Sequence, residues 1–373
     1  MDYGRRNTKK YSFKCSDLKE LKKLSSFVLD PLDFKQRHGK VLHVLSIDVV
    51  EGLMSVLVQF YDPLYRCFTF PDYHLVPMLE EHAHLLGIPI SDKVLFSGLE
   101  KIPRSHVIAE AFHLKKSEID AHLVKKRGIL GLTSDFLIGR ATVFSQAGSM
   151  DAFEAILVLL IYGLALFPNI DGVVDVNAIG IFLIGNLIST LLGDMYFSLH
   201  LRNSKGGGTI VWCVPILYKW FISHLPQTPA FLENRQCLWW SQRLMSLTND
   251  DIVWYDSTLG SLDIIYSCGE FSNVPHIGMQ IGINYNLTLP SRQLGFPLRD
   301  KPNNVQLQGL FLSRGLEAYI IWVKKRALEL KMLYAFERPM YVVVVEPSTL
   351  PNQDINELED ALAQMKQERD LWE

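Results

Sequence analysis

The sequence lacks the features that most readily reveal a protein's compartment or chemistry. Its five cysteines include no Cys-x-x-Cys pair. Neither a disulfide framework nor a cysteine-based zinc site is therefore expected, and such thiols are typical of an intracellular protein. The formal net charge of −3 gives no overall attraction to nucleic acid or to anionic membranes. The polar, basic residues 1–15 lead into no apolar run, so we expect no secretory signal there and a soluble protein of the nucleus or cytoplasm.

Motifs that specify a reaction are also missing. The sequence contains no Gly-x-Ser-x-Gly, no His-Glu-x-x-His and no kinase-type set. Residues 204–209 resemble a phosphate loop only superficially, because they follow a predicted helix and lack the ordered P-loop pattern; they indicate a flexible helix–helix connection. The adjacent carboxylates Asp250 and Asp251 are best interpreted as caps of a turn. We predict no catalytic residue, no cofactor and no enzymatic activity.

A metal site is not expected from the histidines. His74, His82 and His84 are close in sequence, but His82 and His84 are two residues apart on a predicted helix and therefore point to different faces. No cysteine lies at ligand spacing from them. We interpret them as histidines at the helix surface or the edge of the core.

Long apolar runs are limited to residues 153–167 and 178–193. Each is shorter than the ~20 residues that a bilayer core requires, and the first contains Glu154. These lengths favour two buried core helices. A two-span membrane protein is the weaker alternative.

Tryptophan, by contrast, is concentrated in one block. Five of the seven tryptophans lie between residues 212 and 254. Aromatic side chains of this size bury a large area and dominate the core that they join. We therefore predict that Trp212, Trp220, Trp240 and Trp254 are structural core residues.

Hydrophobic periodicity predicts a mostly α fold with minor β. Apolar side chains recur at helical spacing over residues 49–60, 77–87 and 315–332, and residues 102–128 suggest two short helices. Residues 67–70 and 341–347 have the composition of strands. The expected organisation is a basic disordered arm (1–15), a single large helical domain (16–350) and a short C-terminal coiled-coil segment (352–373). The apolar seam of that segment consists of Ile355, Leu358, Leu362 and Met365.

Basic residues gather near the N-terminus. Residues 1–23 hold eight Lys or Arg side chains against three acids, a pattern that can contact phosphates. This arm supports an alternative function, that of a gag-like protein associated with nucleic acid. The triplets Lys125-Lys126-Arg127 and Lys324-Lys325-Arg326 are better explained as solvated faces.

Six segments in order resemble one known family. They are residues 79–90, 162–175, 191–202, 207–226, 252–256 and 291–297. The chain resembles the plant mobile domain, a family also labelled aminotransferase-like, and in particular its legume retrotransposon-related branch, over about residues 35–335. In residues 291–297, Arg292, Gln293 and Gly295 resemble the family signature, and we take them as candidates for a family-specific site; a hydrogen-bond clamp at a helix end is the alternative.

The resemblance implies a helical, non-enzymatic protein-interaction module of transposon origin. Its relatives are transposon-encoded proteins and host proteins linked to transposon silencing in the nucleus, which makes the nucleus the favoured compartment. The expected partner is another protein, or a second copy, bound through the C-terminal helix. At Ser313-Arg314-Gly315 the chain departs from the pattern, because relatives carry a longer basic stretch there.

Overall fold

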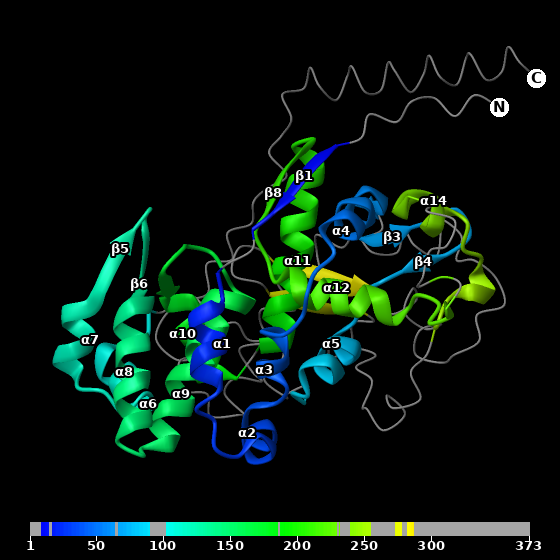
Figure 1. Ribbon diagram of the computed structural model, residues 1–373. Helices are drawn as coiled ribbons and strands as arrows, with labels where there is room; N and C mark the ends of the chain where they lie inside the picture. The colour runs from blue at the N-terminus through cyan, green and yellow to red at the C-terminus, as the bar shows by residue number, and fades with distance from the viewer. Residues whose placement is uncertain are drawn as a thin grey trace, which may run out of the picture. The chain divides into compact units, whose positions relative to one another are not determined.

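The computed structural model of the chain describes residues 9–14, 17–63, 66–89, 102–185, 187–229, 231 and 239–254, together with the backbone of 273–277 and 282–286. These residues all belong to one compact unit, Met1–Phe336. Helices predominate and strands are short (Figure 1), so the predicted fold class, mostly α with minor β, is confirmed. The predicted coiled-coil segment, residues 352–373, lies outside the described residues.

The helices fall into three sequence regions. The N-terminal region contains α1 (Lys19–Ser25), α2 (Pro31–His38), α3 (Val41–Val44), α4 (Glu51–Leu57), the 3-10 turn η1 (Val58–Phe60) and α5 (Leu79–Leu86). The central region contains α6 (Ser105–Ala111), α7 (Lys116–His122), α8 (Ser134–Gln146), α9 (Met150–Ile161), the π-helical turn η2 (Tyr162–Leu166), α10 (Val176–Ile184) and α11 (Leu187–Ser204). The last region contains α12 (Val214–Ser223), α14 (Trp240–Met245) and the 3-10 turn η3 (Asn249–Asp251).

The strands form four small sheets. β1 (Lys10–Phe13) pairs in parallel with β8 (Gly207–Ile210). Two antiparallel three-stranded sheets have the orders β2 (Tyr61–Asp62), β3 (Cys67–Thr69), β4 (His74–Leu75) and β5 (Leu123–Lys126), β6 (Ile129–Thr133), β7 (Val173–Asp175). β9 (Asn273–Ile277) and β10 (Gly282–Asn286) form an antiparallel pair.

Local sequence signals set several helix ends. Proline begins α2, and the carboxylate of Asp30 accepts hydrogen bonds from the N–H groups of Leu32 and Asp33, which satisfies donors of the first turn. Helix α5 ends before Gly87, whose left-handed φ of 60° suits glycine. The prediction of a helix within residues 77–87 is therefore confirmed.

The two apolar runs lie in the core. Residues 153–167 form most of α9 and η2, and their side chains are mostly buried. Residues 178–193 are divided at Gly185, which has a left-handed φ of 76° between α10 and α11. None of the described helices is long and apolar enough to cross a membrane.

The central helices meet β7 at close range. Gly163 of η2 has no side chain, and a Cβ at this position would lie 2.5 Å from Val174 Cγ1. Next to it, the carboxylate of Asp175 accepts hydrogen bonds from the N–H groups of Asn177 and Ala178 and so caps α10. The π-helical turn thus packs directly against a strand that also starts a core helix.

Two predictions about irregular segments are wrong. The arm predicted to be disordered contains β1, and Lys9 Nζ anchors it by donating 3.0 Å hydrogen bonds to the backbone and side-chain oxygens of Asn203. The flexible connection predicted at 204–209 includes β8. β1 and β8 pair with each other, so in both cases a distant strand supplies the backbone partner. The two short helices predicted within 102–128 are α6 and α7, and after His122 the chain continues as β5.

Candidate functional site

The tryptophans occupy different depths. Trp212 and Trp220 are 3% and 0% exposed, whereas Trp240 and Trp254 are only partly buried and pack against the edge of the core. Trp239 is 78% exposed. The two buried indoles also make polar contacts, and these lead to the two most distinctive places in the described part of the chain.

A groove of about 410 Å³ lies beside Trp212. Its floor is apolar and consists mainly of Val44, Ile47, Val49, Leu164, Pro168 and Trp212. Its charged lining residues are Lys14, Lys19, Lys22, Asp17, Asp48 and Glu51. A volume in the range of about 300–1,000 Å³ with an apolar lining and a few polar groups is typical of a ligand pocket.

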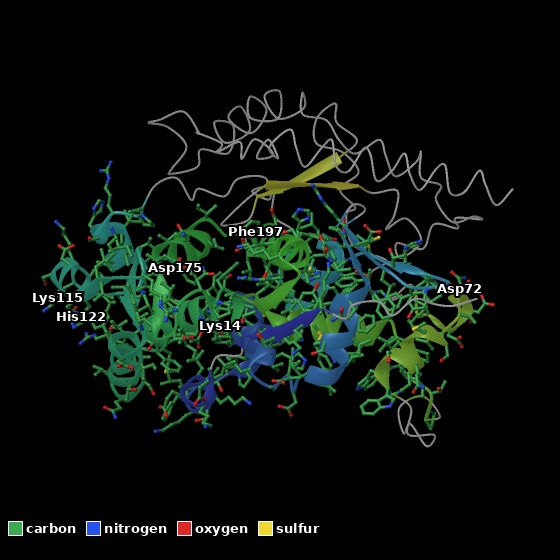
Figure 2. The ribbon with its side chains drawn as sticks, turned by 90° about the horizontal axis from the view of Figure 1, so that it is seen from above. Lys14, Asp72, Lys115, His122, Asp175 and Phe197 are labelled. Atoms are coloured by element: carbon green, nitrogen blue, oxygen red, sulfur yellow. The ribbon has the colours of Figure 1, made fainter. Side chains whose placement is uncertain are left out.

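Separate segments build this groove. Trp212 follows β8, and its indole N–H donates to the carbonyl oxygen of Leu191 (2.9 Å), which fixes this part of the groove floor. Lys14, labelled in Figure 2, follows β1, and its Nζ lies 3.1 Å from Asp171 Oδ1 and donates to Asn169 O at 3.2 Å. The link between α3 and α4 supplies Ile47. The β1–β8 pairing therefore brings together residues far apart in sequence.

The charged residues that line the groove come mainly from two regions of the sequence. Lys19 and Lys22 are exposed on α1, and Lys19 lies 3.4 Å from Asp17, an exposed pair that contributes little to stability. Asp48 and Glu51 lie in or next to the segment that leads into α4, and both are exposed. The groove thus combines an apolar floor with cations from α1 and carboxylates from α4.

A smaller hollow of about 210 Å³ shares Pro168 and Trp212 with the groove. Residues of α11 line its other side, among them Asp194, Phe197 and Arg202. Phe197 is labelled in Figure 2. Trp212 therefore lines both hollows.

The second distinctive place is a buried ionic cluster. Trp220 Nε1–H donates to Glu81 Oε2 (2.6 Å), and His224 Nε2 lies 3.1 Å from Glu81 Oε1. His224 Nδ1 lies 2.8 Å from the carbonyl oxygen of Val253, so this nitrogen must carry a proton. Burial alone would lower the pKa of His224, but the Glu81 carboxylate and the hydrogen bonds outweigh burial and raise it. The Glu81 carboxylate, at ion-pair distance from Nε2, thus favours the imidazolium form of the buried His224 ring.

A third charged cluster surrounds Glu154. Arg37 lies 2.7 Å from Glu154 Oε2 and 2.7 Å from Asp33 Oδ2, and His38 Nε2 is 3.5 Å from Glu154. Burial raises the pKa of Glu154, against the opposing effect of Arg37. Burial and the Arg37 cation lower the pKa of His38. Glu154 interrupts the first apolar run of the sequence, and its partner is thus Arg37 of α2.

The remaining candidates do not assemble into a reactive site. The prediction that His82 lies at a surface or core edge is wrong, because it is 0% exposed. Within the described ranges, no group of three or more His, Cys, Asp or Glu side chains is placed to hold a metal ion. Asp251 accepts hydrogen bonds from the N–H (2.8 Å) and Oγ1 (2.7 Å) of Thr248, so this carboxylate caps a turn as predicted.

Two predicted sets fall outside the described residues. These are the signature Arg292, Gln293 and Gly295 and the coiled-coil seam Ile355, Leu358, Leu362 and Met365.

The groove and the Glu81–His224 pair were not predicted from the sequence. Helical spacing places Glu81 next to buried positions of α5, and a buried acid requires a partner. That signal points to a buried charge but does not identify His224, which lies 143 residues later. Trp212 was correctly predicted as a core residue, but its place in the groove floor depends on long-range contacts.

Comparison with known proteins gives one match. The model of the family described as Domain of unknown function (DUF7745) matches residues 21–329. This range includes the groove floor, the buried ionic cluster and every described helix except the first two residues of α1. No curated protein and no solved structure matches the chain. The chain belongs to the DUF7745 family.

Proposed function

We propose that this chain is a non-enzymatic protein-interaction module whose groove binds an amphipathic segment of a partner protein. The apolar groove with its charged lining is the observation that carries this proposal. Its floor offers the partly buried Ile47 and Val49 to apolar side chains of the partner, and burying each large apolar side chain contributes about 1.5–3 kcal/mol. A helix whose apolar face enters a groove is a common mode of peptide recognition.

The charges define the chemistry of the partner segment. Acidic residues beside its apolar face would meet Lys19 and Lys22, and a basic residue would meet Asp48 and Glu51. Complementary charges of this kind select the partner and its orientation more than they add affinity. A transposon origin and a nuclear location are part of the proposal on the strength of the sequence resemblance to the plant mobile domain.

The nucleic-acid alternative based on the arm has less support. Lys9 Nζ donates to Asn203 and Lys14 pairs with Asp171, so two of the basic residues of this region make contacts within the chain. Binding to nucleic acid through the arm alone would therefore rely on the other cations.

A peptide-display selection against the full chain tests the proposal. We expect enriched peptides to share apolar residues at helical spacing with flanking acids, and to bind the full chain at least about tenfold more tightly than they bind Val49→Lys, because the substitution removes one apolar contact. Val143→Lys is the matched control, since Val143 is 48% exposed on α8 and does not line the groove. Peptides that bind both variants equally, or the absence of any enriched pattern, would contradict the proposal.

A further inference from the structure

Helices α6 and α7 form a compact pair that leads directly into a hairpin. Four residues, 112–115, join the two helices, and His113 among them has a left-handed φ of 55°. Phe112, Leu114 and Ile119 are buried between the helices and the core. Helix α7 then continues into the β5–β6 hairpin. The order helix, turn, helix is that of the helix-turn-helix, and paired strands are a second element that proteins use to contact duplex nucleic acid.

The hairpin is fixed at its root and projects at its tip. β6 pairs with β7 on its other edge, with Gly131 opposite Asp175, and Leu132 is 0% exposed. A Cβ at Gly131 would lie 2.5 Å from Val173 Cγ1, so the strands meet closely there. Figure 1 shows β5 and β6 extending beyond α7 and α8. The tip is therefore presented on a rigid support.

The exposed side chains of this stretch are predominantly cationic. Residues 113–128 contain five Lys or Arg residues and two acids. The exposed cations are Lys115, Lys116, Lys125, Lys126 and Arg127. Lys115 and His122, at the two ends of α7, are both labelled at one edge of the molecule in Figure 2.

Neither of the two acids cancels this charge at the hairpin tip. Glu118 accepts a hydrogen bond from the Lys115 N–H (2.9 Å) and pairs with Arg140 (3.4 Å), so it is engaged locally. The other acid, Asp120, is exposed on α7. The net charge of the stretch is therefore positive where the hairpin meets solvent.

Arg127 occupies a position that does not suit its backbone. Arg127 and Gly128 have φ values of 52° and 85°, which is the left-handed pair of a type I′ turn. Asn, Asp or Gly is preferred at the first of these positions, whereas arginine is strained there. A cation at this tip thus lowers stability, which is common where a residue serves binding.

We propose that this surface binds the phosphate backbone of double-stranded nucleic acid, with contacts from Lys125 and Arg127 at the hairpin tip and from Lys115 and Lys116 at the start of α7. No exposed large apolar side chain lies between residues 113 and 133 of this described stretch. A protein interface or a membrane surface normally requires such side chains, whereas phosphate contacts do not. The hairpin surface is independent of the groove, so either proposal can fail alone.

Fluorescence anisotropy of a labelled 25-base-pair duplex of arbitrary sequence, titrated with the full chain, tests the proposal. Four phosphate contacts predict a slope of about −3.6 in log affinity against log salt, or about a 150-fold loss from 50 to 200 mM KCl. The double variant Lys125→Gln/Arg127→Asn should reduce the magnitude of this slope by about 1.8. At 100 mM KCl it should weaken binding about 60-fold, because each lost contact weakens binding about 8-fold. Asp120→Asn should strengthen binding.

Controls separate binding from folding. Arg127→Asn alone should weaken binding about 8-fold while raising Tm by about 1–2 °C, because asparagine suits the turn. Lys35→Gln, a charge loss at an exposed site on α2, should leave binding within about twofold.

Several results would overturn the proposal. They are unchanged duplex binding by the double variant, no salt-dependent binding by the full chain, and binding to phosphatidylserine vesicles but not to the duplex. A loss of binding seen only with Arg5→Gln/Arg6→Gln would assign the contact to the N-terminal arm instead.

Discussion

His82 allows a quantitative test of the core around α5. Its side chain is 0% exposed, its Nδ1 lies 2.9 Å from the Met78 carbonyl oxygen, and its Nε2 has no hydrogen-bond partner in the described part of the chain. Burial lowers the pKa of His82 from 6.5 to about 4, although Glu81 and the Met78 carbonyl act in the opposite direction. The folded protein therefore holds a neutral imidazole that is protonated in the unfolded chain below pH 6.5.

The sign and size of the effect follow from proton linkage. Because the pKa of His82 is lower in the folded state, the unfolded chain binds more protons between pH 6.5 and about 4, and stability is lost as the pH falls. The full shift corresponds to about 3.4 kcal/mol. Between pH 7 and pH 5 the loss is about 2 kcal/mol.

The assay compares the full chain with His82→Asn by urea unfolding, followed by tryptophan fluorescence at pH 7 and pH 5. Asparagine can still donate to Met78 but does not titrate. The free energy of unfolding of the unmodified chain should fall by about 2 kcal/mol more than that of the variant. Other titrating groups, such as His38, contribute to both proteins and cancel. Equal falls in the two proteins would refute the burial of a neutral His82.

Two further predictions concern packing and charge. Gly163→Ala should destabilise the fold by about 1–3 kcal/mol because its Cβ would meet Val174. Gly139→Ala, in open space on α8, should instead stabilise the fold by about 0.5–1 kcal/mol. If the two alanine variants change the thermal stability equally, the packing of η2 on β7 is contradicted. Glu81→Ala should cost about 3–5 kcal/mol by leaving His224 unpaired. Glu81→Gln should cost less in denaturant unfolding. Because the pKa of His224 is raised in the folded protein, the unmodified chain should lose stability as the pH rises above 6.5. Glu81→Gln should remove this pH-dependent loss, and a glutamine variant that keeps the loss would contradict the ion pair.

The sequence predicted those parts of the fold that depend on local signals. Periodicity and the residues at helix ends were sufficient for α4, α5 and the core position of α9, and a β-branched, aromatic run was sufficient for β3. The sequence showed Glu154 within the first apolar run but not its partner, which is Arg37 of α2.

The errors share one physical cause, which is pairing over long sequence distances. β1 is a strand because β8, about 197 residues later, completes its hydrogen bonds. β5, by contrast, pairs with β6 across the two-residue turn at Arg127 and Gly128, and β6 in turn pairs with the more distant β7. The pairings of β1 with β8 and of β6 with β7 cannot be inferred from a local window. The groove was missed for the same reason, since Lys14, Ile47 and Trp212 meet only after these pairings form.

The central claim is that the groove beside Trp212 binds an amphipathic segment of another protein. Amide hydrogen exchange of the full chain, with and without a saturating selected peptide, tests it most directly. We expect slower exchange in residues 44–51 and 164–168, which line the groove, and loss of this protection in Val49→Lys. Protection confined to other segments, or retained in Val49→Lys, would contradict it.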